Sequence, residues 1–134
     1  DWICELTELE ELTLGGNDLE ELPECLGRLT RITELSLYDN RLTELPQGIG
    51  QLTELTELVM KDNRLTELPA SMGRLRQLEY LVVDGNRLTT LPAALAQTQT
   101  LKTLRIQNNP IDGLPDEIET WIDEMLERGV RVSR

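Results

Sequence analysis

The chain has 134 residues, a net charge of −12 and no histidine. That length fits one domain, while the negative charge argues against nucleic acid and against an anionic membrane face, since both attract basic groups. The missing histidine removes the commonest general base and zinc ligand, and no apolar run approaches the roughly 18 residues of a membrane helix.

Residues 1–5 precede a pattern that repeats every 23 residues. Ile3 and Leu6 lie one period before core leucines of the first complete repeat, so this segment resembles the end of an earlier repeat. Two interpretations stay open. Trp2 and Ile3 cap the exposed end of the core, or the segment is the remnant of a longer array.

Cys4 and Cys25 are 21 residues apart, which is nearly one period, so neighbouring turns could bring them together. A disulfide is geometrically possible, but we expect two reduced, buried thiols. Nothing resembles a signal peptide, and no Asn-x-Ser/Thr glycosylation site is present. These features favour a cytoplasmic location.

About five repeats follow, each marked by an asparagine and, six residues later, by a proline that follows a leucine. Three residue types that share one period indicate a solenoid. The asparagines are Asn17, Asn40, Asn63, Asn86 and Asn109. The prolines are Pro23, Pro46, Pro69, Pro92 and Pro115.

Each repeat contains a Leu-x-Leu segment just before the asparagine, with Met60, Val83 or Ile106 in place of the second leucine in the last three repeats. Side chains alternate along a strand, so the two leucines face inward and their neighbours face out. A buried asparagine amide can both donate to and accept from the bare backbone of adjacent turns, which aspartate cannot do. We therefore predict a structural asparagine ladder. The glycines at 27, 50 and 73 are expected to permit a tight bend.

The third repeat reads LTELVMKDNRLTELPASMGRLRQ and fits LxxLxLxxNxL, so the chain resembles the leucine-rich-repeat family over nearly its whole length. Leu45-Pro46-Gln47-Gly48-Ile49-Gly50-Gln51-Leu52 resembles the tail of the short 23-residue class, found in bacterial repeat proteins and in Ras-associated or scribble-like scaffold proteins. The resemblance implies a right-handed α/β solenoid arc with a parallel concave sheet and short convex turns. It also implies a protein-binding role, without naming the partner.

The outward residues of the strands do not pack in the core, so the repeat does not fix their identity. Residues that recognise a partner can therefore vary at these positions. Stacked glutamates favour a basic patch on a partner, although a solvated column in a Glu-rich protein would look the same. Exposed Tyr and Val flanked by charge are typical of a protein-binding patch, although β-propensity alone could place them there. The predicted partner-binding residues are Glu11, Glu34, Tyr38, Glu57, Val59, Lys61, Tyr80, Val82, Asp84 and Arg105.

Three arginines follow ladder asparagines directly: Arg41, Arg64 and Arg87. They could form a basic stripe for phosphate. Acidic residues two positions before Arg41 and Arg64 and three positions after them favour local ion pairing instead. Exposed pairs of this kind contribute little to stability.

Residues 115–134 change to a helical pattern. Ile118, Trp121, Ile122, Met125 and Leu126 form an apolar stripe at helical spacing. Pro115 is predicted at the first helical position, Arg128 near the end and Gly129 as the stop, before a short closing strand. We expect this helix to cap the last repeat, although a role in docking a partner fits the same stripe.

The sequence thus predicts one leucine-rich-repeat domain over 1–134 that binds a protein on its concave strand face. The alternative is a recognition domain excised from a larger enzyme or a bacterial effector, which would act in a host cytoplasm. Drift in the fourth and fifth repeats favours a natural sequence over an engineered one. We expect a monomer with no catalytic residues, no cofactor, no metal, no nucleic acid and no membrane partner.

Overall fold

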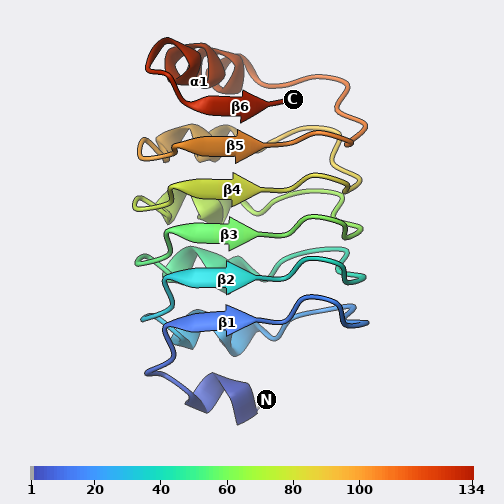
Figure 1. Ribbon diagram of the computed structural model, residues 1–134, viewed down its shortest axis with the longest axis vertical. Coiled ribbons are helices and arrows are strands. Elements are labelled where there is room, and N and C mark those ends of the chain that lie inside the picture. The colour runs from blue at the N-terminus through green and yellow to red at the C-terminus, as the bar shows by residue number, and fades with distance from the viewer. Residues whose placement is uncertain (1) are drawn as a thin grey trace.

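The computed structural model describes residues 2–134. Its strands form one parallel sheet in which every strand pairs with the next along the chain (Figure 1). The strands are β1 (Glu11–Thr13), β2 (Glu34–Ser36), β3 (Glu57–Val59), β4 (Tyr80–Val82), β5 (Thr103–Arg105) and β6 (Arg131–Ser133). The sheet stays open, so the predicted solenoid with a parallel sheet is confirmed.

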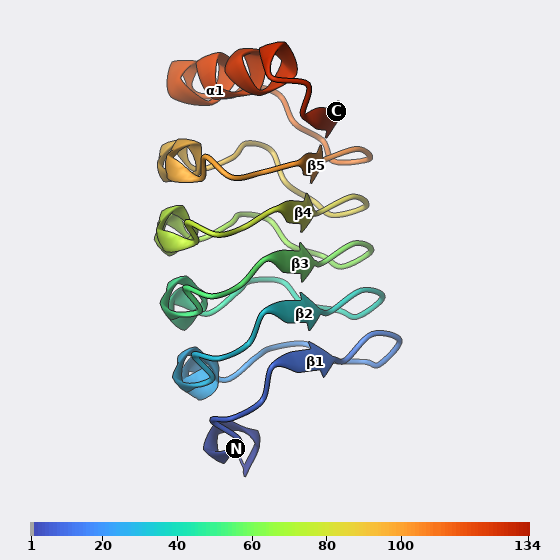
Figure 2. The same cartoon turned by 60° about the vertical axis from the view of Figure 1, so that its left-hand side comes forward.

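Short 3-10 helices make the return side of each turn, opposite the strands (Figure 2). Each of the helices from η2 to η5 starts directly after a proline held in extended conformation, which fixes φ where no donor is needed. The 3-10 helices are η1 (Trp2–Glu5), η2 (Glu24–Arg28), η3 (Gln47–Gln51), η4 (Ala70–Arg74) and η5 (Ala93–Gln97).

The glycines at equivalent positions of these helices allow successive turns to pack closely. A Cβ on Gly73 would lie 2.5 Å from the Ala94 carbonyl oxygen of the next turn, and Gly50 faces the Ser71 carbonyl in the same way. Neither glycine has a positive φ. Glycine is therefore required at these positions because successive turns approach too closely for any side chain.

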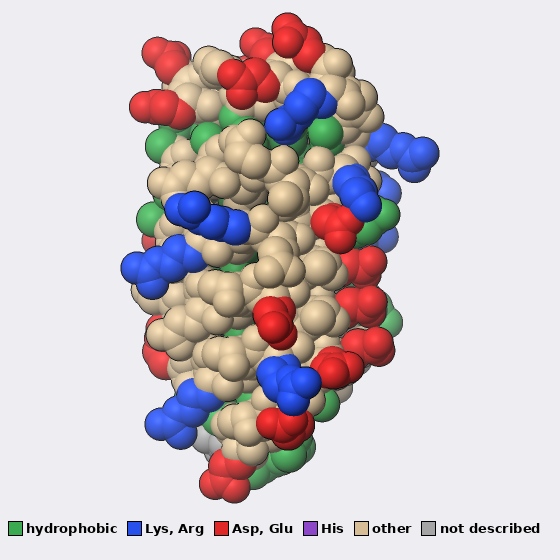
Figure 3. All heavy atoms as spheres, turned by 90° about the vertical axis from the view of Figure 1, so that its left-hand side faces the viewer, with side chains coloured by type: hydrophobic (Ala, Val, Ile, Leu, Met, Phe, Trp, Pro, Cys, Tyr) green, Lys and Arg blue, Asp and Glu red, His purple; other side chains and the backbone are tan. Residues whose placement is uncertain are grey.

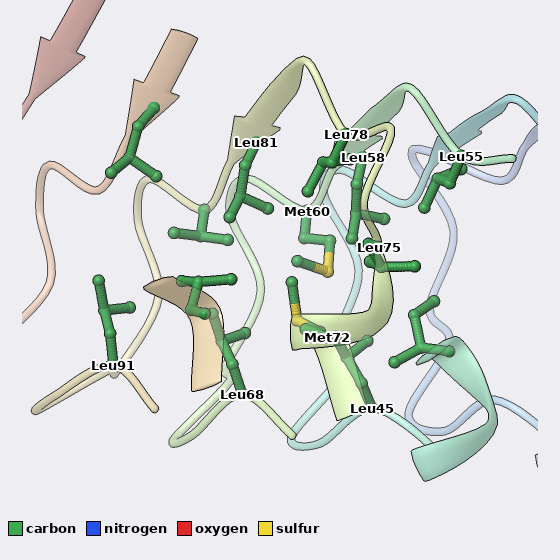
Figure 4. Packing of buried hydrophobic residues seen from close by; sticks show 14 of the residues in the cluster. Leu45, Leu55, Leu58, Met60, Leu68, Met72, Leu75, Leu78, Leu81 and Leu91 are labelled. Atoms are coloured by element: carbon green, nitrogen blue, oxygen red, sulfur yellow. The ribbon is translucent and has the colours of Figure 1, made fainter. Parts of the chain in front are cut away.

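The core is a stack of equivalent leucines between the sheet and the 3-10 helices. Leu58 and Leu81 point inward from the strands, and Leu68 and Leu91 point toward them from the opposite side of the turn (Figure 4). All four are at most 5% exposed. Because each layer of side chains packs on the next, no repeat could bury its apolar face alone.

Asparagine side chains tie each turn to the turn before it. Asn63 donates through Nδ2 to the carbonyl oxygens of Met60 at 3.1 Å and of Leu37, one turn earlier, at 2.9 Å. Its Oδ1 accepts from the Leu42 backbone N–H at 3.1 Å. The same pattern recurs at Asn40, Asn86 and Asn109.

Asn17 stands apart from the others. It is exposed, and its amide bonds only within its own turn, to the carbonyl oxygens of Leu14 at 2.9 Å and Gly15 at 3.3 Å. Asn17 therefore fixes the shape of the first turn without joining two turns.

Helix α1 (Asp116–Glu127) covers the last repeat, and β6 extends the sheet beside it. Trp121 is 2% exposed, and its indole N–H donates to the Thr98 carbonyl oxygen at 2.9 Å. Thr98 stands where other repeats carry leucine, and Trp121 packs against this position. Pro115 precedes the helix by one residue, and Gly129 has the positive φ of 82° that ends it.

Leu126 was predicted to belong to the buried stripe of α1, but it is 51% exposed. The buried members are Ile118, Trp121, Ile122 and Met125. Leu126 follows Met125 directly, so its side chain lies about 100° further around the helix and beyond the edge of the repeat below.

The prediction of reduced cysteines is wrong. Cys4 and Cys25 form a disulfide with Cα atoms 5.7 Å apart, which fastens η1 to η2. Ile3 packs against the core, whereas Trp2 is 74% exposed and covers none of it.

Asn63→Ala leaves the Leu42 N–H and the Leu37 carbonyl without their partner in a buried site. We expect the free energy of unfolding to fall by about 1–3 kcal/mol, measured by urea denaturation. Asn17→Ala is the matched control, because it removes the same side chain without breaking a bond between turns. Equal losses in the two variants would contradict the ladder.

Candidate protein-binding surface

The outward side chains of β1–β6, together with those of the residues that leave each strand, form what we call the strand face. The middle residue of each strand points into the core, as Leu35, Leu58 and Leu81 show by being at most 1% exposed. Alternation then places the first and third residue of every strand on the outside. Parallel pairing sets these residues in two straight columns that cross the strands.

The first column changes its chemistry along the solenoid. In register it reads Glu11, Glu34, Glu57, Tyr80, Thr103 and Arg131. The second column reads Thr13, Ser36, Val59, Val82, Arg105 and Ser133. The residues predicted from widely separated parts of the sequence are thus brought onto adjacent strands.

Apolar side chains occupy the middle of the strand face. Val59 and Val82 are direct neighbours and partly exposed, and Tyr80 beside them is 39% exposed. Tyr38, on the turn after β2, is 43% exposed. Its ring lies against Gly15 of the previous turn, where any Cβ would collide with it. The ring is therefore held in place while one side stays open to solvent.

Three glutamates stack at the N-terminal part of the strand face. Repulsion from Glu11 and then from Glu57 raises the pKa of Glu34 above its usual value, with a small further rise from burial. Within residues 2–134 none of the three carboxylates has an ion-pair partner. The column is an uncompensated negative charge that a cation from a partner could relieve.

Asp84 and Arg105 form an ion pair in the C-terminal half of the strand face. Asp84 is 6% exposed, and its Oδ2 accepts from Nε of Arg105 at 3.0 Å while Oδ1 accepts from the Gln107 N–H at 3.2 Å. Asp84 therefore has no free carboxylate to offer, and we leave it out of the proposed contact residues. Lys61 is exposed.

The sequence predicted that the arginines after the ladder asparagines would form ion pairs with carboxylates a few residues away. They do not. Arg41 pairs with Asp18, the residue at the equivalent position one turn earlier, at 3.1 Å. For Arg64 and Arg87, the described part of the chain supplies no carboxylate within 4.0 Å. The prediction failed because the relevant neighbour lies one period away and not a few residues away.

Across residues 2–134, no group of three or more acidic, cysteine or histidine side chains is placed to hold a metal ion. In the same part of the chain, the helices are all too short or too polar to cross a bilayer.

Family models match the chain. A model for a leucine-rich repeat region matches residues 25–108, and a model for the single leucine-rich repeat matches 8–29 and 100–121. The first match spans more than half of the chain, so the protein belongs to the leucine-rich-repeat family. The 23-residue class stays a prediction from the spacing. No curated protein matches the chain significantly.

Solved structures agree with this assignment. A leucine-rich-repeat protein of Leptospira interrogans is 31% identical over 98% of this chain, with a TM-score of 0.67. The leucine-rich-repeat domain of the type III effector XopL is 32% identical over 88% of it, with a TM-score of 0.78. This chain spans 38% of the length of the Leptospira protein and 43% of the length of the effector's leucine-rich-repeat domain.

A third similar structure is the ectodomain of the plant membrane receptor kinase GASSHO1 from Arabidopsis thaliana. It is 31% identical over 89% of this chain, which spans 15% of its length, and the TM-score is 0.77. That structure was solved in complex with CASPARIAN STRIP INTEGRITY FACTOR 2.

Glu34→Gln should raise the melting temperature at pH 7, because the ionised carboxylate is repelled by its neighbours only in the folded chain. The raised pKa means that protonation removes this penalty as the pH falls, so the gain should shrink through the folded pKa and vanish below the unfolded one. Scanning calorimetry from pH 7 to pH 3 measures it.

Glu54→Gln is the matched control for this prediction. Glu54 is exposed, and the equivalent positions in the adjacent turns hold Arg31 and Gln77, so no stacked carboxylate opposes it. A gain for Glu54→Gln equal to that for Glu34→Gln, or a Glu34 gain that grows as the pH falls, would contradict the account.

Proposed function

We propose that this chain is a protein–protein interaction module that binds its partner on the strand face. The observation that carries the proposal is the contrast between inside and outside. Inward positions repeat leucine with little change, whereas the outward columns differ from strand to strand and place exposed Tyr38, Tyr80, Val59 and Val82 together. Partly exposed aromatic and β-branched groups between charged residues suit a desolvated interface centre.

The family supports this proposal in general terms. Leucine-rich-repeat domains are generally interaction modules and typically not enzymes. A partner is present in the receptor kinase structure that resembles this chain. The proposed role for this protein likewise needs only recognition, with no catalytic residue and no cofactor.

The partner proposed from the charge is a protein with a basic patch. Glu11, Glu34 and Glu57 would steer such a partner and make the association faster at low salt. The same net negative charge would keep separate copies of the chain apart, which favours a monomer as the binding unit.

A second candidate is a recognition domain within a larger protein. The supporting observation is that the similar structures include a leucine-rich-repeat domain of an effector and the ectodomain of a receptor kinase, of which this chain spans 43% and 15%. In that setting the strand face would recruit a substrate or ligand for activity located in another domain.

The two candidates share a test of the binding face. Proteins retained by the immobilised chain are identified by mass spectrometry, and the affinity of the purified partner is measured by calorimetry. Tyr80→Ala and Val82→Asp should each weaken binding about tenfold or more, because they remove or charge the apolar centre. Circular dichroism should show an unchanged fold.

Gln47→Ala is the control on the opposite side of the solenoid. Its side chain is exposed on η3, and only its backbone N–H contacts the preceding turn, through Glu24. This variant should bind like the parent. Loss of binding in Gln47→Ala together with retained binding in Tyr80→Ala would place the partner on the return side and overturn the proposal.

A further inference from the structure

The charge of the strand face changes sign along the solenoid. In the first column the residues run from three glutamates through Tyr80 and Thr103 to Arg131. In the second column they run from hydroxyl residues through two valines to Arg105, and the column ends at the neutral Ser133. Both columns therefore change in the same direction, from acidic or polar over β1–β2 through apolar residues over β3–β4 to one basic residue each over β5 or β6.

The charge at the two ends of the strand face remains when side chains that form an internal ion pair are left out. The three glutamates have no pair within residues 2–134, and in the same range Arg131 has no carboxylate within 4.0 Å. Lys102 is paired with Glu79, and Arg105 with Asp84, although the Arg105 side chain is still 48% exposed. Lys61, just after β3, is an exposed basic residue beside the glutamates, and it too has no carboxylate within 4.0 Å among the described residues. Three unpaired glutamates against this one lysine leave a net negative charge over β1–β3, and the unpaired Arg131 lies at the opposite end of the face.

The space-filling view agrees with this distribution. Figure 3 has the sheet side of the molecule at its right-hand edge, and acidic side chains line the lower part of that edge, over the N-terminal repeats. Basic side chains lie above them, toward the C-terminal repeats.

We propose that the strand face binds an extended partner segment in one charge order, with basic residues over β1–β3, apolar residues over β3–β4 and acidic residues over β5–β6. This inference rests on the proposed function. Six strands at roughly 4.8 Å spacing span about 24 Å, which is the length of about seven extended residues. A short linear segment is therefore long enough to contact all three zones at once.

Opposite charges at both ends fix the order, because the reversed segment would set like charges against each other at each end. The chain direction of the segment is left free, since either terminus can carry the basic residues. What is fixed is which end of the solenoid each charge meets.

The test uses a synthetic seven-residue peptide with two lysines at one end, three apolar residues and two glutamates at the other. A photo-reactive group is placed beside the lysines in one version and beside the glutamates in a second. Cross-links mapped by mass spectrometry should fall on β1–β3 for the first and on β5–β6 for the second. A peptide of equal composition with alternating charges should bind about threefold or more weakly at low salt.

A charge-reversed variant should exchange the two cross-link positions. It carries Glu11→Lys, Glu34→Lys, Glu57→Lys and Arg131→Glu. The matched control makes the same number and kind of charge changes away from the strand face, with its three Glu→Lys changes in the same three repeats, and it should keep the original order. It carries Glu21→Lys, Glu44→Lys, Glu67→Lys and Arg87→Glu, all at exposed positions.

The outcomes separate this inference from the proposed function. Cross-links on the strand face that do not depend on the photo-reactive position overturn the charge order and leave the binding face standing. Cross-links on η2–η5 overturn both. Absence of any peptide binding at low salt, where charge matching is strongest, overturns the charge order, and the Tyr80→Ala measurement with the captured partner then decides the binding face separately.

Discussion

The rest of the structure depends on the asparagine that closes each turn. One side-chain amide satisfies a carbonyl of its own turn, a carbonyl of the preceding turn and an N–H of the preceding turn, as at Asn63. These groups would otherwise be buried without partners, which is costly. The bonds to the preceding turn reach 21 and 26 residues back, on either side of one 23-residue period, so they fix the spacing of the turns and, with it, the register of the strands.

That fixed register separates stability from recognition. Leucines stack on leucines inside, glycines such as Gly50 and Gly73 allow the turns to approach, and α1 and the disulfide close the two ends. Because these devices do not use the outward strand positions, side chains there can vary with little cost to folding. The column of Glu11, Glu34 and Glu57 shows the limit of that freedom, because the fold tolerates the repulsion between these carboxylates without pairing them with a cation.

Much of the fold was predictable from the sequence because one 23-residue pattern repeats over nearly the whole chain. The strands, the solenoid and the capping helix follow from spacing alone. A missed signal lay in the residue before each asparagine, which has positive φ at Gly16, Asp39, Asp62, Gly85 and Asn108. Only glycine, aspartate and asparagine occur there, which are the residue types that tolerate this conformation. The disulfide, the Arg41–Asp18 pair and the exposure of Leu126 depend on how adjacent turns are offset, which local sequence does not encode.

Hydrogen exchange at the Leu42 amide tests the central claim most directly. This N–H donates to Asn63 of the next turn, and Leu88 makes the equivalent bond to Asn109. If the ladder joins the turns, Asn63→Ala should speed exchange at Leu42 by at least about tenfold, the rate equivalent of one lost hydrogen bond. Leu88 should change much less. Equal changes at the two amides, or no change at Leu42, would contradict the account.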